Sequence, residues 1–462
     1  MNAIVLTAIL GVIMMFTGAF VKSKSLPKYL AIAGLVLVFI ANAIELNTGN
    51  SFFNIDLHDM LRTGSFSLTF IAVSIGATLL LVLLNGKDFE SIGIHVAEYF
   101  ALIFFILCGV ALSATFNNLL LLFLGIEIIS IPLYILAGID KRNLKSNEAS
   151  LKYFLMGAFS TGLMLMGIAF IYGGNSNGSF FISSILLGEG KMPVMLAVGM
   201  VFLLVSMSFK VSAAPFHFWA PDVYDGSPMI VTSFMATVVK IAGFFAFIRL
   251  FENAFGSMHS QWQNLIVFIT IATLLIGNIT AIFQQSVKRM LAYSSIAQAG
   301  FMMLALLALN DKAREGIIVY SVAYSLATIG LFAILSKMKD YTIDGFNGMA
   351  KKFPLIAVSA AVFLFSLTGI PLTVGFQAKF LMLLAVIENG GHFWVVVIAV
   401  LFAATSAFYY FRIIQSMFFK PENDENSLPE LSISFKILIL ITALLILVFG
   451  IYPEIIIGWL YH

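Results

Sequence analysis

The sequence predicts an all-α polytopic membrane protein with about fourteen transmembrane helices. Of the 462 residues, 61% are hydrophobic and only 10% are charged. A soluble chain of this length cannot keep its surface hydrated with so few charges. The apolar residues also gather in runs of about 20, the length that crosses a bilayer as a helix. These runs lie near residues 3–21, 28–46, 66–84, 96–116, 118–138, 150–172, 194–216, 228–251, 263–283, 290–309, 315–337, 355–387, 392–418 and 432–451.

The order of these runs divides the chain into four parts. The nearly continuous apolar stretch 96–138 is split at Asn117 and Asn118, because two amides suit a tight turn. The parts are an N-terminal unit of three transmembrane helices, two five-helix units, and a C-terminal transmembrane helix with a tail: 1–95, 96–251 (helices 4–8), 252–420 (helices 9–13) and 421–462.

Helices 7 and 12 are interrupted, and they occupy corresponding positions in the two five-helix units. In helix 7, Pro215 follows Lys210. In helix 12, Gly369 and Pro371 precede Lys379. Proline removes a helical hydrogen bond and clashes with the preceding turn, so both helices should break and leave backbone carbonyls free. Paired broken helices are typical of inverted repeats, and the reversed order of lysine and proline agrees with inversion.

Lysine and arginine set the predicted orientation, because positively charged loops stay on the inner side of a membrane. With an outward N-terminus, the inner loops carry most of these residues, among them Lys141, Arg142 and Lys145. The outer loops carry few. The sequence therefore predicts a multi-pass protein with both termini on the outer side.

Composition argues against several kinds of site. The net charge of +2 gives no reason to expect a nucleic-acid partner, and the single cysteine, Cys108, excludes an internal disulfide or a cysteine-bound iron–sulfur cluster. No phosphate-binding glycine loop is present. His217 is the one histidine near a membrane interior, so a haem would lack a second histidine. We expect neither a cofactor nor a metal in this chain.

Four ionisable residues lie deep inside apolar runs: Glu127, Lys210, Lys240 and Lys379. An acid or a lysine near the bilayer centre costs roughly 2.5–3.5 kcal/mol on insertion scales. Such residues usually handle charge, and they make the candidate site of this chain. Glu127 lies near the midplane of helix 5, and Lys210 in helix 7 is its expected partner. The alternative interpretation is a structural ion pair, although buried pairs seldom add net stability.

The other two lysines have their own alternatives. Lys240 is two or more turns from either interface, which disfavours snorkelling, and a buried lysine exchanges its proton when a neighbouring charge changes. Lys379 lies about eight residues from the outer end of helix 12, where snorkelling competes more strongly. The break beside Lys379 nevertheless indicates a polar, hydrated pocket.

Two further residues are candidates for proton transfer. His217 follows Pro215 and has a titration range suited to a proton relay, but a hydrogen-bonded structural role is an equal alternative. Lys288 lies near an inner helix end, where ordinary interfacial anchoring is the simpler interpretation. The same anchoring role is expected for Lys152 and Arg412.

Several motifs resemble those of a known family. They are LLLFLGIEIISIPLYIL around Glu127, LKYFLMGAFSTGLMLMGIAFIYG at 151–173, FKVSAAPFHFWAPDVYDGSP around Lys210, VKRMLAYSSIAQAGFMM at 287–303 and GIPLTVGFQAKF around Lys379. They resemble the antiporter-like, proton-translocating membrane subunits of respiratory complex I (NADH–quinone oxidoreductase), and the subunit N family most. The resemblance covers about residues 95–420.

The resemblance implies a proton channel in which Glu127 and Lys210 communicate through Lys240 with Lys379. It implies a chain of the bacterial inner membrane without a redox centre. NADH, FMN, iron–sulfur clusters and quinone are then expected in partner subunits, and other antiporter-like and small helical membrane subunits are the expected partners. Subunit M-like relatives carry glutamate at the position of Lys379, and subunit L-like relatives carry a long C-terminal lateral helix.

Two other functions remain open from the sequence. An Mrp-type cation/proton antiporter subunit, or a hydrogenase-linked relative, would use the same lysines. A structural membrane scaffold would use its buried charges only to hold helices together.

Overall fold

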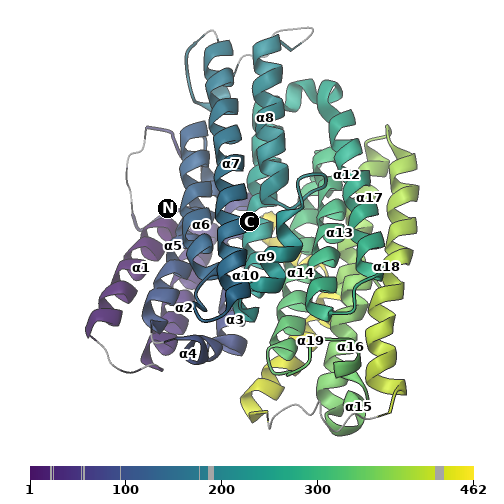
Figure 1. The fold of residues 1–462 in the computed structure, drawn as a ribbon. Helices are drawn as coiled ribbons and strands as arrows, with labels where there is room; N and C mark the ends of the chain where they lie inside the picture. The colour runs from purple at the N-terminus through teal and green to yellow at the C-terminus, as the bar shows by residue number, and fades with distance from the viewer. Residues whose placement is uncertain are drawn as a thin grey trace.

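The structure is a computed structural model that describes residues 1–20, 23, 25–53, 55, 58–93, 95–175, 177–185, 192–421 and 431–461. Within these residues the chain is helical, and β-pairing is limited to three isolated bridges, such as the one between Leu61 and Phe116. The helices form one elongated bundle (Figure 1). Helix α1 lies at one edge, α18 lies at the opposite edge, and α7, α8, α13 and α14 lie between them.

Eleven segments of the described chain are long and apolar enough to cross a membrane by length and composition. This agrees with an all-α polytopic membrane protein. Ten are single helices: α1 (Asn2–Phe20), α2 (Leu26–Thr48), α3 (Ser65–Asn85), α5 (Val96–Thr115), α6 (Leu119–Ala137), α7 (Leu144–Gly174), α13 (Val287–Ala308), α14 (Asp311–Leu335), α18 (Phe393–Phe419) and α19 (Ile433–Ile451). The eleventh, Met229–Ile282, contains α10 (Met229–Phe234), a π-helical turn (Met235–Val239), α11 (Lys240–Phe255), a 3-10 turn (Gly256–Met258) and α12 (His259–Ile282).

The interrupted segments break where the prolines and glycines predict. The seventh apolar run becomes α8 (Val194–Lys210) and, after the turn that holds Pro215, α9 (Trp219–Gly226). The twelfth becomes α16 (Pro354–Thr368) and α17 (Val374–Glu388). Gly369 ends α16 with a φ of 88°, a left-handed conformation that glycine adopts without strain.

Short helices that hydrophobicity did not predict complete the fold: α4 (Asp88–Ile92), α15 (Met349–Lys352) and α20 (Glu454–Ile457), with 3-10 turns at Ile182–Ser184, Asp344–Phe346 and Gly458–Leu460. The expected turn between helices 4 and 5 is present, and Asn118 caps α6 by accepting a hydrogen bond from the Leu120 amide at 2.9 Å. Helix α11 continues to Phe255, past the expected boundary at 251. The start of the expected tail, at 422–430, lies outside the described residues.

Burial separates central helices from those that face outward. In α13 and α14, 94% of the most apolar stretch is buried, against 28% in α1 and 33% in α18 and α19. The central helices carry serine, glutamine and tyrosine among their apolar residues, whereas the outer helices expose large apolar side chains. Polar chemistry is therefore concentrated around α13 and α14, away from the lipid-facing surface.

Arg249 connects the N-terminal helices to the rest of the bundle through hydrogen bonds. From α11, its guanidinium donates to the Phe116 carbonyl at 2.9 Å, the Arg62 carbonyl at 2.9 Å and the Ser67 hydroxyl at 3.0 Å. The Phe116 carbonyl directly follows the end of α5, where helix carbonyls lack intrahelical partners. One side chain thus joins α11 to the end of α5 and the start of α3.

Candidate functional site

Glu127 lies on α6 and is half-buried. Its carboxylate accepts a hydrogen bond of 2.7 Å from the Thr161 hydroxyl of α7. The same hydroxyl lies 3.1 Å from the Gly157 carbonyl, four residues earlier in α7. Because a hydroxyl has one proton, Thr161 donates either to ionised Glu127 or to Gly157, and in the second case it can accept a hydrogen bond from neutral Glu127. Thr161 therefore suits both charge states of the acid.

Lys210 is the last residue of α8, and its side chain reaches across to α6. Its ammonium donates to the Ser130 hydroxyl at 2.9 Å. Ser130 lies one helical turn after Glu127, so the two charged groups approach the same face of α6. Among the described residues they make no direct ion pair within 4.0 Å. Instead of pairing directly as expected, Glu127 is hydrogen-bonded to the Thr161 hydroxyl and Lys210 to the Ser130 hydroxyl.

Groups other than Lys210 donate hydrogen bonds to the carbonyls at the end of α8. The lysine ammonium is therefore free to bind Ser130 on α6. The Trp219 indole donates to the Phe209 carbonyl at 3.0 Å. The Ala213 amide donates to the Ser208 carbonyl at 2.8 Å. The freed carbonyls of this break therefore do not need the lysine.

Lys240 begins α11, directly after the π-helical turn, and only 1% of it is exposed. Its nitrogen donates to the carbonyl of Ser295 at 2.9 Å and to the Ser295 hydroxyl at 2.8 Å, both on α13. The Tyr224 ring lies 5.7 Å from the same nitrogen. Single π-helical turns occur frequently at functional positions. The end of α8 packs close by, because a Cβ on Gly243, one turn after Lys240, would lie 3.8 Å from the Lys210 carbonyl oxygen.

Lys379 on α17 occupies the carbonyl end of α16, and 6% of it is exposed. Its nitrogen donates to the carbonyls of Leu367 at 2.9 Å and Thr368 at 2.8 Å. A cation is favoured there by the helix dipole. The Phe301 ring lies 4.6 Å from the nitrogen. The free carbonyls expected at the second break are present, and the lysine itself is their donor.

A polar face of α13 connects the sites of Lys240 and Lys379. Ser295 binds Lys240, and one turn later Gln298 donates at 2.9 Å to the Leu367 carbonyl that also binds Lys379. The Gln298 amide oxygen accepts from the Tyr320 hydroxyl, and its nitrogen lies 3.3 Å from the Tyr410 hydroxyl. This segment is one of the motifs that resemble the family, but Ser295 and Gln298 were not predicted as site residues. The pattern that could have indicated them is a serine and a glutamine three positions apart in a buried apolar helix.

His217 and Lys288 lie apart from this chain of contacts. His217 is buried in the turn after α8, its ring is tilted against that of Phe218 with 4.6 Å between the ring centroids, and its Nδ1 has no partner among the described residues. Lys288 is buried and donates at 2.7 Å to the carbonyls of Asp225 and Ser227. These two hydrogen bonds join the start of α13 to the segment before α10.

Asp222 on α9 forms an ion-pair cluster near Lys288. Its carboxylate lies 3.0 Å from the Lys152 ammonium of α7 and 3.1 Å from the Arg289 guanidinium of α13. Lys152 also pairs with Glu148 at 2.7 Å. Lys152, for which an interfacial anchoring role was predicted, thus shares the Asp222 carboxylate with Arg289, and the cluster joins α7, α9 and α13.

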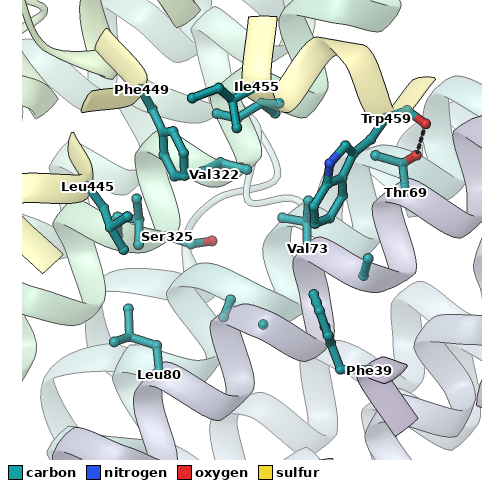
Figure 2. A pocket seen from close by; sticks show the side chains of 15 residues that line it. Phe39, Thr69, Val73, Leu80, Val322, Ser325, Leu445, Phe449, Ile455 and Trp459 are labelled. Carbon is teal, nitrogen blue, oxygen red and sulfur yellow. Dashed lines mark hydrogen bonds between the residues drawn. The ribbon is translucent and has the colours of Figure 1, made fainter. Parts of the chain in front are cut away.

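Two cavities lie beside α14. One, of ≈ 250 Å³, is lined by apolar side chains of α3, α14 and α19, and Trp459 closes one end (Figure 2). The Ser325 hydroxyl and the Thr69 hydroxyl, which donates to the Trp459 carbonyl at 3.0 Å, are polar exceptions in its wall. The other cavity, of ≈ 10 Å³, lies beside Lys379 and is lined by both polar and apolar side chains. The described residues contain no group of three potential metal-ligating side chains.

The arrangement suits proton exchange. A neutral lysine keeps two N–H donors, so Lys379 retains both hydrogen bonds whether or not it is charged. The same holds for Lys240 and the two oxygens of Ser295. Neither lysine pairs with a carboxylate among the described residues. Each can therefore gain or lose a proton without breaking the contacts that hold it.

Comparisons with known proteins identify the family of this chain. Residues 116–406 match the family model described as NADH:quinone oxidoreductase/Mrp antiporter, TM. The NADH-quinone oxidoreductase subunit N of Flavobacterium psychrophilum is 36% identical and covers 99% of each chain. A chain in respiratory complex I from Thermus thermophilus with bound aureothin is 29% identical, with a TM-score of 0.85 over 99% of this chain and 98% of that one.

The fold extends to more distant complexes. A chain of the Mrp complex from a Dietzia species is 18% identical, with a TM-score of 0.89 over 99% of this chain and 95% of that one. At that identity the likeness shows the fold alone. From the full-length relatives and the family match, the chain belongs to the subunit N family of NADH-quinone oxidoreductases, within the wider NADH:quinone oxidoreductase/Mrp antiporter family.

Proposed function

We propose that this chain is a proton-translocating membrane subunit of a bacterial NADH:quinone oxidoreductase. Membership of the subunit N family supports this function. The observation that carries it is the succession of buried ionisable groups, from Glu127 and Lys210 through Lys240 to Lys379, held by hydroxyls and carbonyls on neighbouring helices.

Proton transfer begins, in this proposal, at the acid–lysine pair. Quinone reduction elsewhere in the complex changes the electrostatic environment of Glu127 and Lys210. The altered charge near the end of α8 acts on Lys240, which exchanges its proton with the adjoining polar groups of α13. Lys379 then exchanges with the outer side. His217 lies in the break beside Lys210 and serves as an additional proton relay.

The proposed architecture has about fourteen transmembrane helices in a bacterial inner membrane, with both termini on the outer side. Helices 4–8 and 9–13 form two inverted repeats, at 96–251 and 252–420, after an N-terminal unit at 1–95. The corresponding breaks after α8 and α16 support this division. Residues 421–462 form the last helix and its tail.

The chain works, in this proposal, as a subunit without its own redox centre. NADH, FMN, iron–sulfur clusters and quinone belong to partner subunits, and other antiporter-like and small helical membrane subunits flank it in the bilayer. Its exposed apolar side chains on α1, α18 and α19 suit contact with lipid or neighbouring helices.

The proposal is tested by proton pumping in assembled complexes. In inside-out membrane vesicles, Lys210→Ala and Lys240→Ala should each lower NADH-driven proton uptake by about tenfold or more. Lys420→Ala, which removes an exposed lysine, is the matched control and should pump normally. Wild-type pumping by both buried-lysine variants would contradict the channel.

Affinity purification from mild detergent separates the other functions. Co-purification of flavin and iron–sulfur subunits supports the proposal. Sodium-dependent exchange without those subunits would indicate an antiporter. Lysine variants that no longer assemble would indicate a structural scaffold.

A further inference from the structure

A small cavity with several polar side chains in its wall lies between α13, α14, α16 and α17, beside Lys379. Its volume of ≈ 10 Å³ is close to the space that one water molecule requires. Its wall includes polar side chains from α13, α14, α16 and α17: Gln298, Tyr320, Tyr324, Ser366 and Lys379. Buried cavities of this size and polarity are where proteins hold ordered water.

Two hydroxyls in the cavity wall lack a partner. Tyr324 is 3% exposed and Ser366 is 2% exposed, and neither hydroxyl makes a hydrogen bond to any described residue. A buried hydroxyl without a partner costs about 1–3 kcal/mol. The neighbouring Gln298 and Tyr320 are bonded to each other. The unmet hydrogen-bonding capacity around the cavity therefore belongs to Tyr324 and Ser366.

Lys379 supplies a third polar group. Two of its N–H groups bind the carbonyls of Leu367 and Thr368, which leaves one position on the nitrogen. That position carries a proton in the ammonium and a lone pair in the amine. Because the side chain lines the cavity, a water there can bind either form.

Gly375 shapes the opposite wall. A Cβ at this position would lie 1.8 Å from the Ser366 carbonyl oxygen and 2.8 Å from its hydroxyl oxygen. Glycine thus allows α17 to approach the end of α16 beside the Ser366 hydroxyl. A larger residue at this position would collide with the backbone of α16.

Tyr324 also faces the other lysine site. Its hydroxyl lies near those of Ser295 and Thr328 without forming a well-aligned hydrogen bond to either, and Ser295 binds Lys240. Tyr324 is thus placed between the partner of Lys240 and the cavity that Lys379 lines. The fully bonded Gln298 network runs alongside without an unpaired group of its own.

We propose that this cavity is a binding site for one water molecule, held by Tyr324, Ser366 and Lys379, and that Tyr324 and this water form the proton link between Lys240 and Lys379. The inference rests on the proposed function. A proton leaving the Lys240 ammonium enters at Ser295, and each oxygen along the link accepts one proton and releases its own. The amine of Lys379 takes up the last proton, so every hydroxyl and the water end neutral.

Substitutions that remove one oxygen atom test the link in assembled complexes. Tyr324→Phe and Ser366→Ala should each lower NADH-driven proton uptake by roughly fivefold, the value of one hydrogen bond. The double variant should lose no more than either single variant, because both hydroxyls hold the same water. Ser366→Thr keeps a hydroxyl and should restore most of the rate. Ser325→Ala is the matched control, since Ser325 is the next residue of α14 but faces the apolar cavity (Figure 2).

Ordered water in a density map of the complex is the direct measurement. A peak within hydrogen-bond distance of Tyr324, Ser366 and Lys379 is expected, and a map that resolves neighbouring waters but shows none there would overturn the site. Normal pumping by Tyr324→Phe and Ser366→Ala, with Lys240→Ala inactive, would overturn the link alone. Normal pumping by Lys240→Ala and Lys379→Ala would overturn the proposed function itself.

Discussion

The helix-end carbonyls at the two helix breaks obtain their hydrogen-bond donors in different ways. After α8, the Trp219 indole binds the Phe209 carbonyl, and Lys210 extends to Ser130 beside Glu127. After α16, Lys379 itself binds the carbonyls of Leu367 and Thr368. The first lysine is half-buried near an acid, whereas the second is almost fully buried among neutral oxygens.

This difference suggests different tasks for the two lysines: Lys210 responds to charge, and Lys379 exchanges a proton. A lysine beside a carboxylate responds to any change in the charge of that carboxylate. A lysine between two carbonyls keeps its contacts in both protonation states. The first break is therefore suited to receive an electrostatic signal, and the second is suited to hold an exchangeable proton in a fixed position.

The largest expected effect on stability comes from removing the lysine that acts as a cap. Lys379→Met leaves the Thr368 carbonyl without its side-chain donor in a buried place, and should lower the free energy of unfolding by about 1–3 kcal/mol. Lys210→Met should cost less, because its partner Ser130 still donates to the Ile126 carbonyl at 2.7 Å. Thermal unfolding of the purified complexes measures both. Equal losses would contradict the contrast between the breaks.

The indole that caps the first break provides the next test. Trp219→Phe removes the donor to Phe209 and should cost about 1 kcal/mol of stability. The Phe209 carbonyl then keeps the Ser212 amide as a donor, so Lys210 can take the vacant acceptor position and leave Ser130, and proton uptake should also fall. Trp262→Phe is the control, since Trp262 makes the same kind of bond to the Phe255 carbonyl at 3.0 Å away from the charged residues. It should lose stability but pump normally, and equal pumping by both variants would rule out this use of Trp219.

A smaller effect is expected from the hydroxyl that holds Glu127. Thr161→Val preserves shape but removes the 2.7 Å hydrogen bond, and should lower proton uptake by roughly fivefold. Thr161→Ser should retain the rate. Thr270→Val, which removes a hydroxyl bonded only to its own helix at Ile266, is the control. A Thr161→Val complex with full activity would show that the acid needs no positioning.

The smallest effect belongs to an exposed pair that serves as a baseline for the buried charges. Lys420 donates to Asp344 at 2.9 Å and holds the pKa of that carboxyl below its ordinary value. A carboxyl whose pKa is lower in the folded state stabilises the fold at pH values above about 3.9, the pKa of the unfolded state. This stabilisation is lost as the pH falls through the pKa of the folded state. Lys420→Met should therefore change stability by less than about 1 kcal/mol at pH 7, and by progressively less as the pH falls below about 3.9. A larger change in thermal unfolding at pH 7 would remove the distinction between exposed and buried charges.

Much of the helical framework could be predicted from hydrophobicity, because spans of about 20 apolar residues leave a helix as the one way to satisfy the backbone. The breaks at Pro215 and Gly369 followed from backbone chemistry. The four buried charges were visible because each interrupts an apolar run. The subunit family was also identified from the motifs, and the full-length relatives confirm it.

The partners of those charges could not be predicted. Lys210 meets Ser130 and not Glu127 directly, because the end of α8 approaches α6 one turn further along. Ser295, Gln298 and Tyr324 gain their importance only when α13 and α14 are placed between the lysines. Such contacts depend on helix rotation and register, which hydrophobicity leaves open when a helix is buried all round.

Asp222 has a consequence for how the bundle moves. Its carboxylate, on α9, is shared by Lys152 of α7 and Arg289 of α13, at a half-exposed position. Any tilt of α7 against α13 must lengthen at least one of these salt bridges. Dissolved ions weaken exposed pairs of this kind, so this contact between α7 and α13 should loosen as ionic strength rises, whereas the hydrogen bonds of the carbonyl-bound lysines inside should not depend on salt.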